Sequence, residues 1–382
     1  MLRSGLKSTL IALIFGVVST AVLLEVSLRI ASHLGVITPA ERLTEPISFY
    51  RDDEPAVGVW HPPNRSFLAR ADCFQVLYQS NSYGARDRER ELRSEAPRAV
   101  VLGDSFVEGI GVEFGRRMTD LLEARSGFEH LNFGTAGNFS SIQEWKLYET
   151  LASRFDHDWV LIFAFPNNDF VENDPDKFWQ PDRYRPYLRR VGDSYEVFYS
   201  IDLAEAKRRA ETQLYWNHWY NAFYVYRLIS FLDSQIRVRF AQGKTTEYGY
   251  IGYEQFDDED LERLFYSYRR IRDAAGGRDV VVFTIPRLND FLYFLDEGYP
   301  GRLPQRLQQF ADSENHIQYY DLIPGFVDDW LAHGRRFADY FIPCDGHWSE
   351  LGSAVAADVV LKSLSDLYRT SSRRSSPPGA GN

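Results

Sequence analysis

Cysteine is scarce in this sequence, and the residue spacings that bind metal ions are missing from it. Cys73 and Cys344 are the two cysteines among 382 residues, too few for a disulfide scaffold or a cysteine-based zinc site. Whether they pair with each other stays open, because a disulfide needs Cα atoms that lie ~5–6 Å apart in the fold. No His-Glu-x-x-His or similar spacing occurs among the 8 histidines. We therefore expect neither a metal ion nor another cofactor.

Positive charge is also in short supply. The chain has 43 Lys and Arg against 54 Asp and Glu, which gives a net charge of −11. A protein this acidic repels phosphate backbones, so binding to nucleic acid is not expected. Its 44% apolar and 25% charged residues are typical of a globular protein. The aromatic content of 15% supplies material for a large core and for surfaces that hold sugars or other flat ligands.

One long apolar run lies at the N-terminus. It covers residues 9–24 and extends to about Ala31, long enough to cross a ~30 Å hydrocarbon core, and it follows Arg3 and Lys7. These features predict a cytoplasmic stub and transmembrane signal anchor in residues 1–31. The alternative is a signal peptide cleaved near Ala21, but the apolar run continues past that residue. In either case the bulk of the protein works outside the cytoplasm.

The rest of the chain divides by composition into three segments, the second of which contains an insertion. Residues 32–97, rich in Pro, Arg and Asp, predict an extended lead-in over a main domain at 98–369. Within that domain, residues 171–256 are polar and aromatic and predict a helical insertion, with a long helix over Tyr215–Phe240 that either packs on the core or forms a lid or ligand groove. Residues 370–382, rich in Ser, Arg, Pro and Gly, predict a disordered tail.

The main domain alternates short, continuously apolar runs with helical patterns. This alternation is typical of an α/β fold whose parallel sheet is covered on both faces. The predicted strands are 99–103, 128–133, 159–165, 279–285 and 317–320. The predicted helices are 117–125, 140–154, 257–275, 304–311 and 349–368.

The first predicted strand ends in Gly103-Asp104-Ser105, which places a serine where parallel sheets carry their active sites. Ser105 at a helix N-terminus is a candidate nucleophile, and a helix-capping serine is the simpler alternative. A P-loop is excluded because no Gly-Lys-Ser/Thr follows. The absence of a Gly-x-Ser-x-Gly elbow around Ser105 argues against an α/β-hydrolase.

Three further residues follow strands or precede the last helix. Gly137 follows the second strand and Asn168 the third, and a backbone N–H or a side-chain amide there is a suitable donor to an oxyanion, although both residue types are common in turns. Asp345 and His347 precede the final helix and form a candidate base with its orienting acid. A capping Asp beside an exposed His is the alternative interpretation.

Together these blocks resemble the SGNH (GDSL-like) hydrolase family, in the family's order. The resemblance covers roughly residues 98–369, with the middle segment as an insertion, and implies a flavodoxin-like three-layer α/β/α sandwich. It also implies that Ser105 is the nucleophile, His347 the base and Asp345 its partner. The oxyanion hole would then consist of Ser105, Gly137 and Asn168.

Further likenesses refine this expectation. Residues 81–87 (NSYGARD) look like the lead-in of membrane-anchored bacterial members, which implies a single-pass bacterial inner-membrane protein with its catalytic domain in the periplasm or outside the cell. Two positions depart from the family pattern. Phe106 replaces the Leu of the family name, and Asp345-x-His347-Trp348 replaces the commoner Asp-x-x-His. The tighter spacing is similar to that of SGNH-like proteins that O-acetylate exopolysaccharides such as alginate.

The resemblance predicts a serine esterase that hydrolyses an acyl ester through an acyl-serine intermediate. We expect an O-acetyl ester on an envelope or extracellular carbohydrate as the substrate. A polysaccharide O-acetyltransferase using the same triad is one alternative, and a non-catalytic binding protein with this fold is another. The acyl group, the glycan and any protein partner are not specified by the sequence.

Overall fold

A computed structural model describes residues 2–34, 36, 49–71, 73–229, 232 and 250–374. The chain forms two compact units. The larger contains the described residues of 49–69, 73–210 and 245–382, and the smaller those of 1–48, 70–72 and 211–244.

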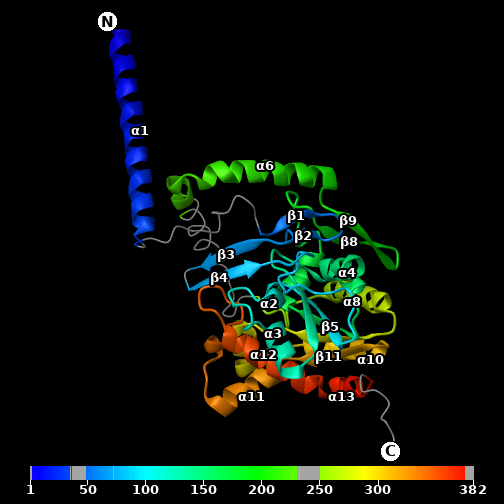
Figure 1. The fold of residues 1–382 in the computed structure, drawn as a ribbon. Helices are drawn as coiled ribbons and strands as arrows, with labels where there is room; N and C mark the ends of the chain where they lie inside the picture. Colours follow the sequence, from blue (N-terminus) through cyan, green and yellow to red (C-terminus); the bar gives the residue numbers. More distant parts are fainter. Residues whose placement is uncertain are drawn as a thin grey trace, which may run out of the picture. The chain divides into compact units, whose positions relative to one another are not determined.

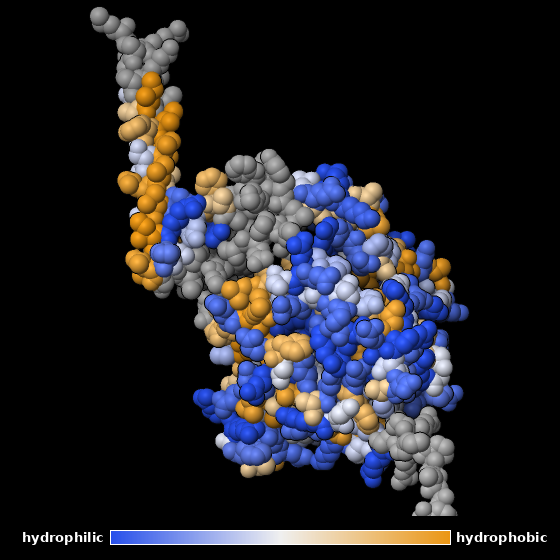
Figure 2. All heavy atoms as spheres, in the orientation of Figure 1, coloured by the Kyte–Doolittle hydropathy of each residue, from blue (hydrophilic) through white to orange (hydrophobic). Residues whose placement is uncertain are grey.

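The smaller unit is dominated by the N-terminal helix α1 (Leu2–His33). Within the described part of the chain, one stretch, Ile11–His33, is long and apolar enough to cross a membrane, a test that a signal sequence also passes. Apolar side chains cover much of the helix surface (Figure 2). Its Glu25 carboxylate accepts hydrogen bonds from the backbone N–H groups of Tyr224 (3.0 Å) and Val225 (2.9 Å), at the start of a helical turn over 224–229.

The larger unit is built on a five-stranded parallel sheet with strand order β11-β10-β7-β5-β6 (Figure 1). In chain order this is 2-1-3-4-5, the flavodoxin-like arrangement. The α/β fold class with a central parallel sheet is therefore confirmed, and the five predicted strands match the observed ones to within about two residues. The strands are β5 (Arg98–Gly103), β6 (Glu129–Gly134), β7 (Trp159–Ala164), β10 (Asp279–Thr284) and β11 (Ile317–Asp321).

Alternating residues of each strand enter two separate apolar cores, which explains why the strands read as continuous apolar runs. In β5, Val100 and Leu102 join one core, while Ala99 and Val101 join the other. Helices cover both faces of the sheet (Figure 1). The first core is completed by α4 (Ser141–Thr150), α8 (Asp258–Ala275) and α10 (Leu303–Ser313), and the second by α3 (Met118–Ser126), α9 (Leu288–Glu297), α11 (Ile323–His333) and α12 (Glu350–Ser363).

Residues 49–69 and 73–97 of the predicted lead-in belong to the larger unit, and the described residues of 32–48 and 70–72 belong to the smaller. The lead-in forms two strand pairs. Val57, Val59 and Trp60 are buried in the core that contains α4 and α8, so this segment contributes to the fold. The pairs are β1 (Arg51–Glu54) with β2 (Gly58–Trp60), and β3 (Ser66–Ala71) with β4 (Phe74–Gln79).

The predicted helical insertion also contains a hairpin. Strands β8 (Pro186–Val191) and β9 (Ser194–Tyr199) pair in antiparallel register across a two-residue turn at Gly192, whose φ of +60° suits glycine. Helix α6 (Leu203–Asn221) follows and includes the first residues of the helix predicted over Tyr215–Phe240. Residues 233–240 of that prediction lie outside the described residues.

The C-terminal helix differs from its prediction. The helix expected over 349–368 is divided at Leu364 into α12 and α13 (Ser365–Arg374). Helix α13 therefore continues into the segment predicted to be disordered from residue 370. The last part of that segment, 375–382, lies outside the described residues.

Candidate active site

The carboxyl end of β5 positions Ser105 at the centre of the sheet. Strand β5 lies between β6 and β7, where the chain order reverses, so its end opens into the crevice that doubly wound sheets use for ligands. Ser105 begins the short helix α2 (Ser105–Glu108), and Asp104 caps it by accepting the Phe106 N–H at 2.9 Å. A Cβ on Gly103 would come within 2.4 Å of Val107 Cγ2, so this tight turn requires glycine.

Asp104 also connects the nucleophile turn to the end of β7. Its Oδ2 accepts a hydrogen bond from the Asn168 side-chain amide at 3.0 Å, in helix α5 (Pro166–Asp169). Burial raises the pKa of Asp104 to about 6, although the Phe106 N–H, the His347 charge and Asn168 oppose this rise. The predicted oxyanion donor Asn168 is therefore held next to the nucleophile turn.

The structure brings Ser105, His347 and Asp345 together in a linear chain of contacts. Ser105 Oγ lies 2.6 Å from His347 Nε2, and His347 Nδ1 is hydrogen-bonded to Asp345 Oδ1. The His347 and Asp345 side chains are 23% and 10% exposed, so the chain of contacts opens to solvent at its histidine. This is the geometry of a nucleophile, a base and an orienting acid.

The loop that carries Asp345 and His347 is fastened at several points. Cys344 forms a disulfide with Cys73, which lies immediately before β4, and the two Cα atoms are 5.9 Å apart. Ile342 donates its N–H to the His347 carbonyl at 2.7 Å and accepts the N–H of Asp345 at 3.1 Å. The pairing of the two cysteines, which the sequence left open, thus fixes one end of the loop.

The two departures from the family pattern touch each other. The Phe106 ring lies 4.8 Å from the His347 ring and 5.1 Å, edge to face, from the Trp348 ring, measured between centroids. Phe106 and Trp348 are both buried. The aromatic residue after the candidate nucleophile therefore packs against the aromatic residue after the candidate base, and this contact links the Ser105 turn to the His347 loop.

A buried arginine from the segment 81–87 holds the far end of α2. The Arg86 guanidinium donates to the carbonyl oxygens of Glu108 (2.9 Å), Gly109 (2.6 Å) and Val112 (2.7 Å) and lies over the Tyr78 ring. These carbonyls face the C-terminus of the nucleophile helix, where backbone acceptors lack intrahelical partners. Burial lowers the pKa of Arg86 despite the neighbouring Tyr78.

A second buried charge links the nucleophile helix to the turn that follows β6. Glu108 accepts the backbone N–H of Ala136 at 2.5 Å and the Tyr50 hydroxyl at 2.7 Å, and its carboxylate lies 3.5 Å from His61 Nε2. Burial alone would raise the pKa of Glu108, but His61, Arg86 and Tyr50 outweigh burial and hold it below its usual range. This carboxylate is therefore charged and fixes the turn before Gly137.

Gly137 lies in that turn with a φ of +95°, a backbone conformation that favours glycine. A Cβ there would meet Val59 Cγ2 at 3.1 Å and Arg183 Nη2 at 3.6 Å. Among the described residues, no acceptor takes the backbone N–H of Ser105 or of Gly137. Both groups therefore remain available to a ligand, as the sequence-based hypothesis requires.

A group of buried carboxyls lies behind the nucleophile turn. Neither oxygen of Glu144 and only one oxygen of Asp169 has a hydrogen-bond partner among the described residues. Burial, reinforced by the nearby Asp104 charge, raises the pKa of Glu144 well above its usual range. Burial and the Glu144 charge act in the same direction on the pKa of Asp169. The described residues contain no set of three His, Cys, Asp or Glu side chains placed to hold a metal ion.

Sequence reasoning missed Arg86, Glu108 and His61. All three are buried polar residues whose partners are distant in the chain: Arg86 contacts residues 22 to 26 positions later, and the His61 ring reaches Thr135 at 3.0 Å. One usable signal was present, because Arg86 lies in the segment 81–87 that resembles a family lead-in.

No known family model matches this chain, and no curated protein sequence matches it. Among solved structures, it is similar to a lipolytic protein of the G-D-S-L family from Veillonella parvula, at 13% identity and a TM-score of 0.37 over 71% of this chain and 99% of the other. It is also similar to a family 3 carbohydrate esterase from Clostridium thermocellum, at 11% identity and a TM-score of 0.37 over 72% of this chain and 98% of the other. A third similar structure is an acetyl xylan esterase from Butyrivibrio proteoclasticus, at 8% identity and a TM-score of 0.35 over 73% of this chain and 66% of the other.

Proposed function

We propose that this protein is a serine esterase that removes an acyl group, with O-acetyl as the expected case, from an extracytoplasmic carbohydrate. The contact chain from Ser105 Oγ through His347 to Asp345 carries this proposal. A hydroxyl placed 2.6 Å from an imidazole that is itself oriented by a carboxylate is the arrangement that activates serine as a nucleophile.

In the first half of the reaction, Ser105 Oγ attacks the ester carbonyl carbon while its proton moves to His347 Nε2. Asp345 holds the other imidazole nitrogen and stabilises the imidazolium. As the bond to the sugar oxygen breaks, His347 gives that proton to the leaving hydroxyl, and the acyl group stays on Ser105. Water then attacks the acyl-serine, loses a proton to His347, and releases the carboxylic acid as the proton returns to Ser105.

The negative charge that develops on the carbonyl oxygen needs donors that are already in place. The free backbone N–H groups of Ser105 and Gly137 are the proposed donors, together with the second N–H of the Asn168 amide, whose first is used by Asp104. Each such donor is worth roughly 10²–10³ in rate. Because Glu108 fixes the turn before Gly137, the two sides of this oxyanion site are joined by a buried charge.

The proposed location is the outer face of a membrane that α1 crosses. Its span, Ile11–His33, has the length and composition required, and basic residues precede it. The Cys73–Cys344 disulfide supports the same placement, because disulfides persist in oxidising compartments such as the periplasm.

The test uses the full chain in detergent micelles with p-nitrophenyl acetate and an acetylated xylo-oligosaccharide. We expect Ser105→Ala to lose nearly all activity, by at least about 10³-fold, with unchanged thermal unfolding. Ser153→Ala, which alters an exposed serine in the turn after α4, is the matched control. Wild-type turnover in the Ser105 variant contradicts the proposal.

The same assay separates hydrolysis from transfer. An unacetylated oligosaccharide is added, and its mass is followed together with nitrophenol release. Release of acetate without a change in sugar mass supports the esterase. If the sugar gains an acetyl group and this gain depends on Ser105, the protein is instead a transferase that uses the same three residues.

A further inference from the structure

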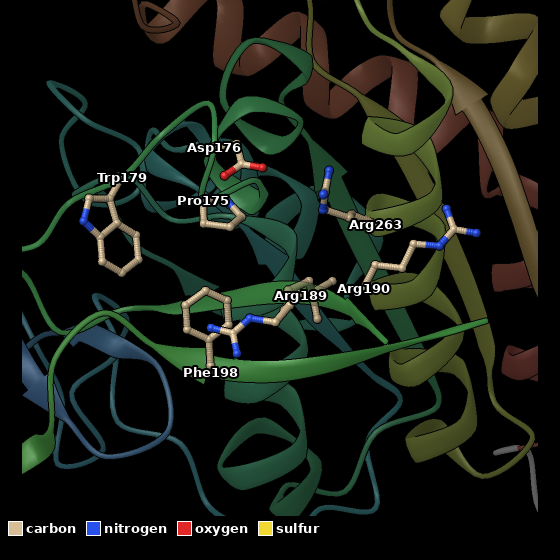
Figure 3. Close-up of a pocket in the computed structure, with 8 residues that line it drawn as sticks. Pro175, Asp176, Trp179, Arg189, Arg190, Phe198 and Arg263 are labelled. Carbon is tan, nitrogen blue, oxygen red and sulfur yellow. The ribbon is translucent and has the colours of Figure 1, made fainter. Parts of the chain in front are cut away.

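A pocket of about 520 Å³ opens between the β8–β9 hairpin, the chain that follows α5, and helix α8 (Figure 3). This volume lies within the range of ordinary small-ligand sites. Its residues are separate from the triad and from the proposed oxyanion donors. The pocket is lined by two aromatic rings, three arginines and one carboxylate: Trp179, Phe198, Arg189, Arg190, Arg263 and Asp176.

The aromatic residues form an exposed platform on one side of the pocket. Trp179 is 48% exposed. The centroid of its ring lies 5.3 Å from that of the Tyr187 ring and 6.3 Å from that of the Phe198 ring. An exposed ring that is supported by two neighbouring rings is suited to packing against the apolar face of a sugar.

The arginines of the pocket differ in how they are paired. Arg190 forms an ion pair with Glu259 at 2.7 Å, and Arg263 forms one with Asp174 at 3.0 Å. Arg189 lies with its guanidinium carbon 4.3 Å from the Phe198 ring centroid, and no described carboxylate forms an ion pair with it. In Figure 3 its side chain extends alongside that ring toward Trp179. The exposed Arg189 guanidinium and its N–H donors thus lie beside the aromatic platform.

A second arginine of the lining is mostly buried. Arg263 is 8% exposed, and its buried Nε has no acceptor among the described residues. Against these donors the pocket offers one carboxylate, that of Asp176, as an acceptor. Donors therefore outnumber acceptors, and this favours a ligand rich in acceptor oxygens, such as a carboxylate.

We propose that this pocket binds an acidic sugar residue, such as a uronate, of the carbohydrate that carries the ester. This proposal rests on the proposed function for its choice of substrate class. Trp179 packs on the ring, and Arg189 binds the carboxylate. Because the chain has a net charge of −11, it repels an acidic polymer overall, and the local positive charge of Arg189 offsets that repulsion at the pocket.

The pocket is close enough to the candidate active site to act on the same polymer. Pro175, at the pocket rim, follows Asn168 by seven residues in the chain. A fully extended segment of that length spans at most roughly 25 Å. One oligosaccharide chain can therefore occupy the pocket while another of its residues lies at Ser105.

The test measures binding by titration calorimetry to the full chain in detergent, with Ser105→Ala as the background so that no ester is cleaved. Three hexasaccharides are compared: hexagalacturonate, its methyl ester, which keeps the rings and removes the charge, and maltohexaose. We expect hexagalacturonate to bind at least about tenfold more tightly than its methyl ester. Arg189→Gln should abolish that difference, and Trp179→Ala should weaken binding of both.

Two further variants complete the test. Asp176→Asn should tighten hexagalacturonate binding, because it removes the one carboxylate that repels the ligand. Arg208→Gln, at an exposed arginine of α6, should change nothing. The proposal is overturned if hexagalacturonate and its methyl ester bind with equal affinity. It is also overturned if Arg189→Gln still binds hexagalacturonate more tightly than the methyl ester by the same factor as the parent. Ser105-dependent esterase activity is measured separately in the parent protein. Failure of the pocket proposal would leave that activity in place, whereas failure of the proposed function would remove it.

Discussion

The two halves of the candidate site are held in different ways. Ser105 belongs to a turn between a central strand and a short helix, and buried side chains such as Arg86 and Glu108 bind the backbone on either side of it. Asp345 and His347 lie on a loop whose supports are a disulfide, a few backbone hydrogen bonds and one aromatic contact. The candidate nucleophile is therefore fixed by the buried framework of the sheet, whereas the candidate base lies on a loop fastened to that framework.

This difference predicts separable effects. A change on the nucleophile side should lower the stability of the whole larger unit, because the groups that position Ser105 also satisfy buried polar atoms. A change on the base side should affect activity beyond any loss of stability, because the loop can move while the sheet remains intact. The substitutions below test that separation.

The largest effect is expected from removing the disulfide with Cys73→Ser and Cys344→Ser together. The link closes a loop of 271 residues, so its loss should lower the free energy of unfolding by about 5 kcal/mol. Urea unfolding followed by tryptophan fluorescence measures this. Esterase activity, assayed where the variant is still folded, should also fall, because the His347 loop loses its attachment. Full activity in the folded variant would show that the loop needs no tether.

Arg86→Met should lower the free energy of unfolding by about 3 kcal/mol, because it leaves three buried carbonyls without their charged donor. The same urea titration measures it. Arg88→Met, at a neighbouring arginine whose side chain is 47% exposed, is the control and should cost less than about 1 kcal/mol. If the two variants lost the same free energy of unfolding, the buried hydrogen bonds of Arg86 would contribute no more to stability than the exposed contacts of Arg88.

Glu144→Gln should change how stability depends on pH. The folded pKa of Glu144 is raised, so its stabilising contribution is complete below the unfolded pKa of ~4.3 and is lost as pH rises toward the folded pKa, at up to ~1.4 kcal/mol per pH unit. Wild-type stability should therefore fall more steeply than that of the variant between pH 5 and 8, measured by urea unfolding at each pH. Glu149→Gln, on the exposed face of the same helix, should run parallel to wild type.

The smallest effect is expected where the two halves meet. Phe106→Leu restores the residue of the family name but removes ring contacts with His347 and Trp348. We expect a loss of about 1 kcal/mol in stability and a fall of a few-fold in kcat with little change in KM, from steady-state kinetics. Phe114→Leu, at a ring that is 56% exposed, is the control. Unchanged kcat would show that the aromatic contact does not orient the base.

The parts of the fold that depend on local patterns were predictable from the sequence. Each central strand is an apolar run because both of its faces are buried, and the sheet-edge rule then brings Ser105 and Asn168 to one edge. The β8–β9 hairpin was missed although Gly192-Asp193 is a recognisable turn signal, because the aromatic composition around it favoured a helix.

Long-range polar contacts were not predictable in the same way. Nothing near Arg86 or Glu108 in the sequence indicates which carbonyl or N–H each will meet, since those partners come from other turns of the folded chain. The pairing of Cys73 with Cys344 has the same cause. Two cysteines 271 residues apart in sequence are brought together by the folded chain and by no local pattern.

That pairing also sets an order of events during biosynthesis. Cys73 leaves the ribosome 271 residues before Cys344. The disulfide can close only after Cys344 has been synthesised and both thiols have met oxidising conditions. Ser105 is thus synthesised early and the disulfide-fastened His347 loop later, so a chain that stops before Cys344 lacks the completed candidate site.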